Sequence, residues 1–600
     1  MSDATLSLVV LAGVIALFVW NRLSVGTVAL LTALALYVTG LVDATTAVSG
    51  FGDPVVVFIA SLFVLSEGLE ASGVTAWAGQ LLVRHAGTRR GPLLIGSMVL
   101  AALMAAVVTP NGAAAALLPV VVLAARRSDR SAAQMLMPLA FAASAGALLV
   151  LSGSTVNVIV SDALAESTGD RFGFFEFALM GLPLVLVTIA VSLLLGRRLL
   201  PDRKPDTVTA DFSDHLSTLV EHYSLEQGFF RTRVTAGSAL VGATTDALDV
   251  PAEVLVVGVQ HVDGRPAGTD EAIDPDDVLV VSGPSEGVAQ LVERYALEVV
   301  TTPLTRGTRE ALLGRDAGVA ELVVPPRSDL IGQRVFPGVV RGGVTVLAVR
   351  RLGRERGAQS TDLAEGDMLL VHGTWPAVEA LAQDETVLVV DDPEQVRRQA
   401  VPLGATAWRA LAVLAVTIAL LASGAVPPAI AGLVGAVGMI LTRTVLPQQA
   451  YRAISWQTVV LVGGLIPLSA AISSSGAADL IADHLVALVD DGEPRLLLTV
   501  LFLLTLVLGQ VVSNTATVLI VVPIAVSAAQ ESGIALAPVL MLVAVAGAAS
   551  FLTPIATPAN MIVMGPAGYR FGDYWKLGLA TTAAWFVVAV GLIPVFWPTG

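Results

Sequence analysis

A polar tripeptide, Ser513-Asn514-Thr515, interrupts a long apolar stretch near the C-terminal end of the chain. If the tripeptide forms the tip of a hairpin between two half-helices, the second half-helix offers unpaired backbone N–H groups and the positive end of its dipole. Those groups suit an anion, and the amide of Asn514 adds an oxygen that can coordinate Na⁺ as a hard cation. Serine, asparagine and threonine also cap helices without any ligand, so the tripeptide alone fits both interpretations.

A second interruption, Ala556-Thr557-Pro558, breaks the apolar run that we expect to face this hairpin. A proline at such a point frees backbone carbonyl groups, which are natural ligands for sodium. A shift of 403 residues places Gly153-Ser154-Thr155 at the equivalent point of an earlier run, so that Ser154 and Thr557 are equivalent positions. A kinked helix whose break is filled by neighbouring helices is the alternative.

The counterpart of the first tripeptide is Thr109-Pro110-Asn111, at a shift of 404 residues. Proline has no side-chain oxygen, so Pro110 cannot replace the amide of Asn514. Asn111 can reach the same space from one position later. A one-residue insertion or deletion in the loops explains why the shift changes between 403 and 404. The pattern therefore predicts two related tips that differ in their chemistry.

Titratable side chains give little support for an enzyme. Glu67 and Glu70 lie late in an apolar run; we expect them near the inner membrane surface, although an acid there keeps proton coupling open. None of the six histidines lies in a broken segment or forms an HExxH pair, so we expect surface or soluble-domain histidines rather than a metal site. The sequence lacks a nucleophile–base or metal constellation, so we expect no enzyme, and it lacks a GxGxxG motif, so we expect no dinucleotide-binding half in the soluble domains. No organic cofactor is predicted.

Composition points to the membrane as the environment of these breaks. The 600 residues are 55% hydrophobic and 14% charged, with a mean hydropathy of +0.79, whereas soluble proteins have about 25% charged residues. Together with the long apolar runs, these values predict a polytopic α-helical membrane protein. They argue against a soluble enzyme, a disordered chain or a nucleic-acid binder. Cysteine is absent, which excludes a thiolate metal site.

The elements that must position the breaks form two membrane repeats, which we place at residues 1–200 and 403–600. The breaks align as well as the apolar runs do, whereas chance similarity of Ala and Val is the alternative. If residues 93–125 and 496–528 are re-entrant hairpins, each repeat crosses the membrane about five times, and the odd count makes the two repeats inverted.

Charge indicates the orientation, because Lys and Arg near span ends favour the cytoplasm. With residues 205–400 inside, the outer flanks hold only Arg171 and Arg495, and both termini are extracytoplasmic. The inner flanks then hold Arg22, Arg84, Arg89, Arg90, Arg126, Arg127, Arg130, Arg197, Arg198, Arg203, Lys204, Arg409, Arg443, Arg452, Arg570 and Lys576. We therefore expect a multi-pass protein of the cell membrane, in contact with its lipid.

An acidic block separates the two repeats, since residues 201–400 carry a net charge of −14 out of −15 for the chain. A shift of 90 residues aligns the block with itself, which predicts two small α+β domains at 206–302 and 303–396. Short β-branched runs predict their strands, and residues 286–296 and 376–383 predict a helix in each. Arg350, Arg351 and Arg354 could bind an anionic nucleotide, although a solvated basic turn is the simpler interpretation.

The motifs resemble those of the divalent anion/sodium symporter (DASS) family. Ser513-Asn514-Thr515, followed by Pro523, resembles its Ser-Asn-Thr hairpin signature, and residues 553–573 resemble its late discontinuous helix and tail. The acidic block looks like a pair of TrkA-C (RCK C-terminal) domains, which a subgroup of that family carries between its membrane halves. The family pattern has Asn where Pro110 stands and Thr where Asn111 stands, so the first sodium site is altered or lost, or the coupling ion differs.

The resemblance implies a homodimeric secondary transporter with an elevator motion, and it implies which residues do the work. Sodium would be bound at Thr109, Asn111, Gly153, Asn514 and Ala556. The substrate would be bound by Asn111, Ser154, Ser513, Asn514, Thr515, Thr557 and Pro558.

The function that follows is cation-coupled uptake, with Na⁺ as the expected coupling ion. The substrate would be a small divalent anion, for which dicarboxylate, citrate and sulfate stay open. The soluble pair would regulate the transporter from the cytoplasm. Two alternatives are an exporter of arsenite or another oxyanion, from the same superfamily, and an RCK-regulated ion channel or potassium transporter. The latter would be favoured by a TVGYG-like filter, which the sequence lacks.

Overall fold

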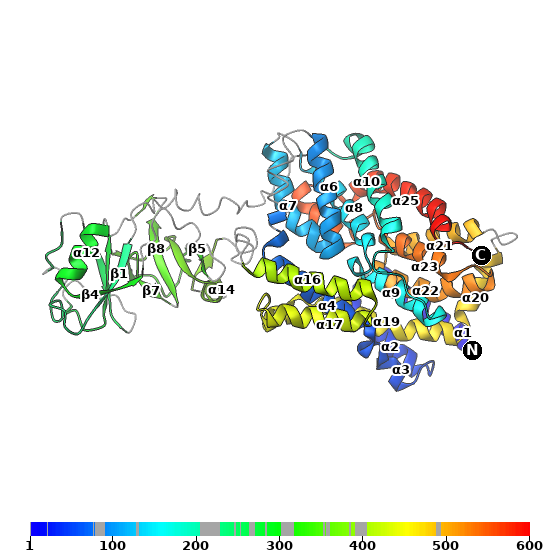
Figure 1. The fold of residues 1–600 in the computed structure, drawn as a ribbon, viewed down its shortest axis with the longest axis horizontal. Helices are drawn as coiled ribbons and strands as arrows, with labels where there is room; N and C mark the ends of the chain where they lie inside the picture. The colour runs from blue at the N-terminus through cyan, green and yellow to red at the C-terminus, as the bar shows by residue number, and fades with distance from the viewer. Residues whose placement is uncertain are drawn as a thin grey trace. The chain divides into compact units, whose positions relative to one another are not determined.

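The computed structural model divides the chain into two compact units, Met1–Ala210 with Leu403–Gly600, and Asp211–Pro402. Figure 1 shows the helical first unit and the strand-rich second unit. The predicted boundaries at 206, 302, 303, 396 and 403 lie outside the described residues, as do Arg84, Arg89, Arg130 and Lys204. The structure describes residues 2–20, 22–75, 77–78, 90–127, 131–203, 229–244, 248–251, 254–262, 271–282, 285–301, 317–341, 343–351, 354–355, 360–382, 386–390, 405–487 and 494–599.

The first unit is built from two runs of helices. The N-terminal run contains α1 (Asp3–Trp20), α2 (Val25–Val38), α3 (Ala44–Ser49), α4 (Pro54–Ala71), α6 (Arg90–Val107), α7 (Pro110–Arg127), α8 (Ala133–Gly146), α9 (Thr155–Thr168) and α10 (Ala178–Leu199). The C-terminal run contains α16 (Ala405–Ser423), α17 (Pro428–Leu441), α18 (Pro447–Ala453), α19 (Trp456–Ser474), α20 (Ala477–Ala487), α21 (Pro494–Gly509), α22 (Asn514–Glu531), α23 (Leu536–Ala548), α24 (Pro558–Ala567) and α25 (Tyr574–Phe596).

Length and composition mark this unit as a multi-pass membrane protein. Among the described residues, seven helices are long and apolar enough to cross a membrane, and seven further apolar helices are shorter. The long ones are Asp3–Trp20, Ala44–Ala71, Ala178–Leu199, Thr406–Ser423, Trp456–Ser474, Asn514–Glu531 and Phe571–Phe596. Because α22 is among them while α21 is not, length alone does not decide whether residues 496–528 form a re-entrant hairpin.

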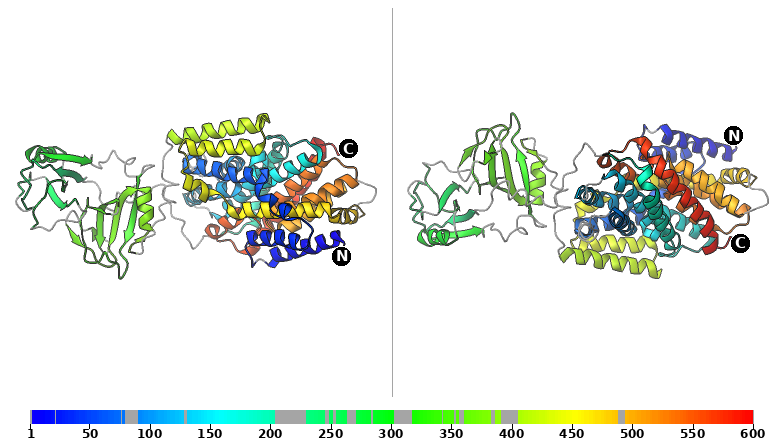
Figure 2. Two further views of the ribbon diagram at one scale, coloured as in Figure 1. Left: turned by 90° about the horizontal axis from the view of Figure 1, so that it is seen from below. Right: turned by 90° about the horizontal axis from the view of Figure 1, so that it is seen from above.

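Helices of one run pack against helices of the other in matching pairs. α2 packs on α19, and α17 packs on α4; likewise α3 lies against α19, and α18 lies against α4. α22 contacts α9, and α7 contacts α24. In Figure 2, α16 and α17 lie side by side in both views. The first two helices of the N-terminal run, α1 and α2, are also in contact with each other. Each run therefore completes the packing of the other.

α10 and α25 meet through equivalent positions. The indole Nε1 of Trp585 donates to Thr188 Oγ1 over 2.8 Å, and both side chains are fully buried. A shift of 397 residues relates these two positions, and the same shift relates Gly181 to Gly578. These glycines lie against the carbonyl groups of Leu148 and Phe551, so that a Cβ on either would collide with backbone. Small residues thus allow both helices to approach their broken segments closely.

Among its described residues, the second unit holds a small two-stranded sheet, β10-β6, and two larger antiparallel sheets whose strand order matches at a shift of 90 residues. The first has the order β2-β3-β1-β4, and its helix is α12 (Ser285–Arg294). The second has β8-β11-β5-β12 in the equivalent places and α14 (Trp375–Ala382) as its helix. The strands are β1 (Phe229–Val234), β2 (Leu255–Gln260), β3 (Val278–Ser282), β4 (Leu297–Thr301), β5 (Ala317–Val323), β6 (Arg334–Val335), β7 (Val340–Arg341), β8 (Val344–Arg351), β9 (Arg354–Glu355), β10 (Thr361–Asp362), β11 (Met368–Thr374) and β12 (Leu388–Val389).

The two sheets share an interface inside this unit. The side-chain amide of Gln260 donates to Val340 O over 2.5 Å and accepts from Val340 N over 3.1 Å, as a backbone amide would in a ladder. Val280 of the first sheet belongs to the apolar core of the second. The predicted helices at 286–296 and 376–383 are present as α12 and α14, within two residues at either end.

Candidate functional site

The second predicted tip, Ser513-Asn514-Thr515, lies between α21 and α22. Ser513 caps α22 by accepting a hydrogen bond from Ala516 N over 3.4 Å. Asn514 and Thr515 begin the helix and are half-buried, with their side chains turned toward other elements. Asn514 Oδ1 accepts from the hydroxyl of Ser550 over 2.6 Å. The tip is therefore a capped helix start that also carries tertiary contacts, so the cap alone does not account for all three residues.

The break opposite this tip separates α23 from α24. Thr557 has extended backbone angles, φ −139° and ψ 144°, and caps α24 by accepting from Asn560 N. The side chain of Asn560 is fully buried, and its Nδ2 donates to Ser550 O over 3.0 Å and Thr553 O over 3.1 Å. This amide thus pairs two carbonyl groups that the broken helix leaves without intrahelical partners.

The earlier break, between α8 and α9, has the same construction. Ser154 has φ −146° and ψ 145° and caps α9 by accepting from Val156 N. Asn157 is fully buried, and its Nδ2 donates to Ala147 O over 2.8 Å and Val150 O over 2.9 Å. In both breaks the acceptors lie ten and seven residues before the asparagine. The shift of 403 residues relates Asn157 to Asn560, and the sequence analysis assigned neither a role; we call both asparagines braces, because each holds two carbonyl groups of its break.

In both bracing asparagines, the side-chain oxygen lacks a hydrogen bond. The Oδ1 atoms of Asn157 and Asn560 are buried, and neither has a hydrogen-bond partner in the described part of the chain. The two donated bonds fix the amide orientation, because a flipped amide would place oxygen against carbonyl oxygen. An unpaired buried acceptor costs about 1–3 kcal/mol. Bracing two carbonyl groups offsets that cost at each break.

One hydrogen bond joins the second tip to the first break. Thr515 Oγ1 lies 2.8 Å from Thr155 Oγ1, and the two residues are 360 positions apart in the chain. This hydrogen bond joins α22 to α9. The equivalent pair of helices, α7 and α24, is also in contact, so the helix of the first tip lies against the second break. Each tip's helix therefore also contacts the break of the other run, and Thr155 is a residue that the sequence reasoning did not single out for a role.

The first tip differs in composition and in its neighbours. Thr109 caps α7, accepting from Gly112 N over 3.1 Å, and Pro110 occupies the first helical turn, where a missing N–H costs nothing. In the part of the chain that the structure describes, the amide of Asn111 makes no hydrogen bond. The carboxylate of Glu70 lies at this tip, since a Cβ on Gly112 would stand 2.6 Å from Glu70 Oε1. The expectation of a surface role for Glu70 therefore needs correction, because this half-buried acid reaches the tip.

The remaining predicted residues have less distinctive surroundings. Gly153 and Ala556 are buried, and a Cβ on Gly153 would collide with the carbonyl of Ala147. Pro558 is exposed at the start of α24. The oxygen atoms at the tips and breaks come from hydroxyl, amide and carbonyl groups, and at the first tip also from the carboxylate of Glu70, a donor set that suits a hard cation such as Na⁺.

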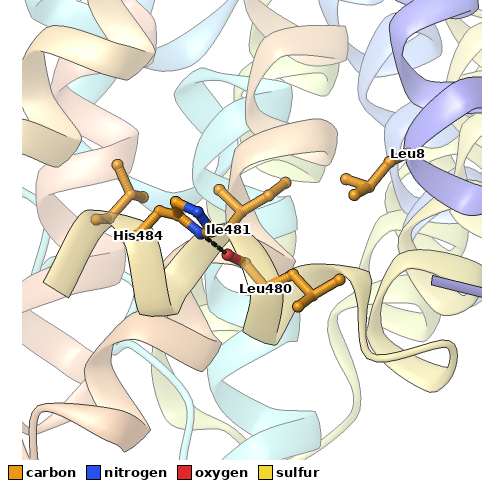
Figure 3. Close-up of a pocket in the computed structure, with 5 residues that line it drawn as sticks. Leu8, Leu480, Ile481 and His484 are labelled. Atoms are coloured by element: carbon orange, nitrogen blue, oxygen red, sulfur yellow. Dashed lines mark hydrogen bonds between the residues drawn. The ribbon is translucent and has the colours of Figure 1, made fainter. Parts of the chain in front are cut away.

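An apolar hollow elsewhere in this unit is a poor candidate for the site. It has a volume of about 340 Å³ and is lined by Leu8, Leu480, Ile481, His484 and Leu485. Figure 3 shows His484 turned back on its own helix, where its Nδ1 lies 2.7 Å from Leu480 O. A ring paired with its own helix among aliphatic side chains offers an anion little binding.

Comparison with known proteins agrees with a membrane transporter. The uncharacterised transporter YfbS of Escherichia coli is 30% identical over 98% of both chains. The uncharacterised transporter sll0640 of Synechocystis is 28% identical over 96% of this chain and 94% of its own. Sodium/sulfate cotransporter 1 of Chlamydomonas reinhardtii is 24% identical over 61% of this chain and 42% of its own. The YdaH transporter of Alcanivorax borkumensis aligns over 98% of this chain and 99% of its own, with 14% identity and a TM-score of 0.46.

The family assignment rests on two matches to a family model, which together run from residue 15 to residue 598. The model of the citrate transporter family, CitMHS, matches residues 15–546 and again residues 469–598. Those ranges include both tips and both breaks. The chain is a transporter, and it belongs to the citrate transporter family.

Proposed function

We propose that the protein takes up a small divalent anion, with Na⁺ as the coupling ion. The observation that carries this proposal is the hydrogen bond between Thr515 and Thr155, because it joins a helix start to a broken helix at one oxygen-rich point. Helix starts attract anions through their N–H groups and dipoles, and broken segments supply carbonyl oxygens for cations. The names of the relatives, a citrate transporter family and a sodium/sulfate cotransporter, fit the same pairing of substrate and ion.

Residues at the tips and breaks have separate roles in this proposal. The anion is held by Asn111, Ser154, Ser513, Asn514, Thr515, Thr557 and Pro558. Sodium is held by Thr109, Asn111 and Gly153 at one site and by Asn514 and Ala556 at the other. Ser550, whose hydroxyl meets Asn514 Oδ1, orients the amide at the second site. Citrate, a dicarboxylate and sulfate are the substrates to test.

The proposed architecture follows the DASS subgroup that carries TrkA-C domains. Residues 1–200 and 403–600 are inverted repeats that move as an elevator within a homodimer. Residues 206–302 and 303–396 are the cytoplasmic TrkA-C-like domains, with a nucleotide as a further candidate ligand. The matching helix pairs of the two runs support the repeats. Arg351 is already engaged with Asp367, so a nucleotide would have to rely on other basic residues.

Orientation can be tested apart from transport, because the chain has no cysteine of its own. A single cysteine in place of Asp3 should react with an impermeant thiol reagent in intact cells, and one in place of Ala358 should not. The reverse pattern would place residues 205–400 outside and overturn the orientation.

Glu70 supports a second candidate for the coupling ion. Its carboxylate reaches the tip at which Pro110 stands in place of an amide, so a proton on Glu70 is an alternative to a sodium ion there. The coupling at the second tip would stay sodium-dependent in either case, since Asn514 is present.

Uptake into proteoliposomes tests the function and the coupling together. Radiolabelled citrate, succinate and sulfate should be offered with an inward Na⁺ gradient, with an inward proton gradient, and with neither. We expect one of these anions to accumulate under the Na⁺ gradient and to leave when the gradient is collapsed. Accumulation that is strengthened by adding a proton gradient to the Na⁺ gradient would assign a proton to Glu70, and accumulation driven only by protons would contradict sodium coupling at both tips. The absence of uptake of all three anions by a folded, reconstituted protein would contradict the proposal.

A further inference from the structure

Two buried aspartates occupy equivalent turns in the two sheets of the second unit. Asp277 accepts from Asp274 N over 2.8 Å through its Oδ2, and Asp367 accepts from Ala364 N over 2.8 Å in the same way. Their side chains are 1% and 0% exposed. A buried carboxylate needs compensation by an opposite charge or by several hydrogen bonds, so the neighbours of each aspartate are the relevant comparison.

The second sheet compensates its aspartate with a fixed charge. Arg351 donates to Asp367 from Nε and from a terminal nitrogen, over 2.7 Å each. This bidentate pair satisfies both carboxylate oxygens and leaves no positive charge to be supplied from outside. At the positions of Glu271 and Asp274 this turn has Thr361 and Ala364; its other acids are Asp362, which pairs with Arg334, and Glu365.

The first sheet has a histidine and two extra acids in the same places. His261 takes the position of Arg351, with its Nδ1 2.9 Å from Asp277 Oδ2 and its Nε2 3.4 Å from Glu271 Oε2. Glu271 and Asp274 take the positions of Thr361 and Ala364. Burial lowers the pKa of the imidazole, but Asp277 and Glu271 outweigh burial and raise it. Three carboxylates thus surround one imidazole, and the cluster carries an excess of negative charge.

We propose that this cluster, formed by His261, the exposed Asp274 and the buried Asp277 with the exposed Glu271 beside them, is a binding site for a divalent transition-metal ion. One ligand atom from each of His261, Asp274 and Asp277 lies within 4.8 Å of the others. A ligand set of one imidazole and several carboxylates suits Zn²⁺ or Mn²⁺, whereas Mg²⁺ and Ca²⁺ prefer oxygen ligands alone. The ion supplies the positive charge that Arg351 supplies in the second sheet.

The site lies in the unit that does not contain the tips and breaks, so its expected role is regulatory. An ion bound here ties the end of β2 (His261) to the turn before β3 (Asp274 and Asp277). Gln260, which precedes His261, holds Val340 of the second sheet through two hydrogen bonds. Binding at His261 therefore acts one residue from the contact between the two sheets.

Metal titration of the purified full-length protein tests the site. With any affinity tag removed, Zn²⁺ would be titrated in competition with a chromophoric chelator, with Mg²⁺ as the comparison ion. We expect one equivalent of Zn²⁺ per chain and much weaker binding of Mg²⁺. His261→Arg installs the pair of the second sheet, so it should fold and should weaken Zn²⁺ binding by about 100-fold. Asp274→Ala, which matches Ala364, should weaken binding without adding a charge.

A gain-of-site variant provides the converse test. The triple substitution Arg351→His, Thr361→Glu and Ala364→Asp copies the cluster into the second sheet and should add a second equivalent of Zn²⁺. Wild-type protein that binds no stoichiometric Zn²⁺, or a folded His261→Arg variant with unchanged Zn²⁺ affinity, would overturn the proposal. Neither result bears on transport, which depends on residues of the other unit.

Discussion

The two helix tips have similar backbone construction but differ in how they are held. At the second tip, Gln510 Oε1 accepts from Leu552 N over 3.0 Å, and Asn514 meets Ser550, so polar side chains tie the hairpin to its own break. The equivalent positions of the first run are Ala106, Pro110 and Ala147. There the hairpin is held by close packing, since a Cβ on Gly146 would collide with the backbone of Ala102.

This difference teaches that cap geometry and site chemistry can diverge within one fold. A hydroxyl cap and a helix start are present at both tips, because any helix needs its first N–H groups paired. The amide that could hold an ion is present at the start of α22 and is replaced by proline at the start of α7. The first tip gains a carboxylate from α4 instead. The chemistry of the two tips is therefore different although their frame is shared.

The largest effect should come from Asn514→Ala. The change removes the amide and leaves the hydroxyl of Ser550 with only the more distant carbonyl groups of Gly509 and Gly547, at 3.4 Å each, so we expect uptake to fall by about 100-fold or more. Asn111→Ala is the matched control at the first tip, and it should have a smaller effect because the Asn111 amide makes no hydrogen bond in the described structure. Uptake rates of both variants, with gel filtration to verify folding, check this order. Equal losses would show that the tips contribute equally.

Next in size is the loss of a brace. Asn560→Ala or Asn157→Ala leaves two carbonyl groups unpaired and opens a small cavity, which should cost about 2–4 kcal/mol of folding free energy. Thermal unfolding in detergent would measure the loss for each variant. Asn→Asp at the same positions keeps the shape but replaces the donor, and it should be equally damaging. A variant of either asparagine with unchanged stability would show that its break is held by packing alone.

We expect an intermediate loss of stability from a substitution at the contact between Glu70 and Gly112. The equivalents of these residues in the second run are Ser473 and Ala516. Gly112→Ala should therefore be destabilising by about 1–3 kcal/mol, since its Cβ would overlap the carboxylate. Adding Glu70→Ser should recover part of that loss, because it copies the second run but leaves Val108 Cγ1 2.9 Å from the new Cβ. A double-mutant cycle on unfolding measures the coupling, and additive effects would mean that the carboxylate can move away at little cost.

The smallest effect should follow Pro110→Asn. The first helical turn tolerates either residue, so the change should alter stability by less than about 1 kcal/mol. If the first tip has lost a sodium site through Pro110, the variant should show a steeper dependence of uptake on Na⁺ concentration. An unchanged dependence would mean that Asn111 already substitutes for the missing amide, or that the first tip never binds sodium.

Many helix starts and the repeat of the two sheets could be predicted from the sequence, because breaks in apolar runs and repeated patterns are visible without any structure. The interruptions at Ser513 and Ala556 lie where α22 and α24 begin, and the shift of 90 residues matches the strand order of the two sheets. The contact between Thr155 and Thr515 was not predictable, since it joins side chains that are 360 positions apart. The approach of Glu70 to Gly112 likewise depends on how α4 packs against the tip.

The histidines show a different limit of prediction from sequence. The sequence analysis set all six aside because no two of them stand at metal-ligand spacing. His261 becomes informative only when strand register places it opposite Asp277 and when Arg351 is seen in the same place beside Asp367. A comparison of the two domains position by position could have raised the question, but only the fold shows that the acids converge.

The buried bond between Trp585 and Thr188 has a consequence for the ancestry of the chain. In an assembly of two identical subunits, a contact between equivalent positions would join two copies of the same residue. A tryptophan donating to a threonine cannot arise that way, because the indole has no acceptor for a second indole. After a gene duplication and fusion, each half could mutate alone, and one position could specialise as the donor and the other as the acceptor. If the two runs of helices arose by duplication and fusion, the pair is a mark of their later divergence, since it needs two segments of different sequence.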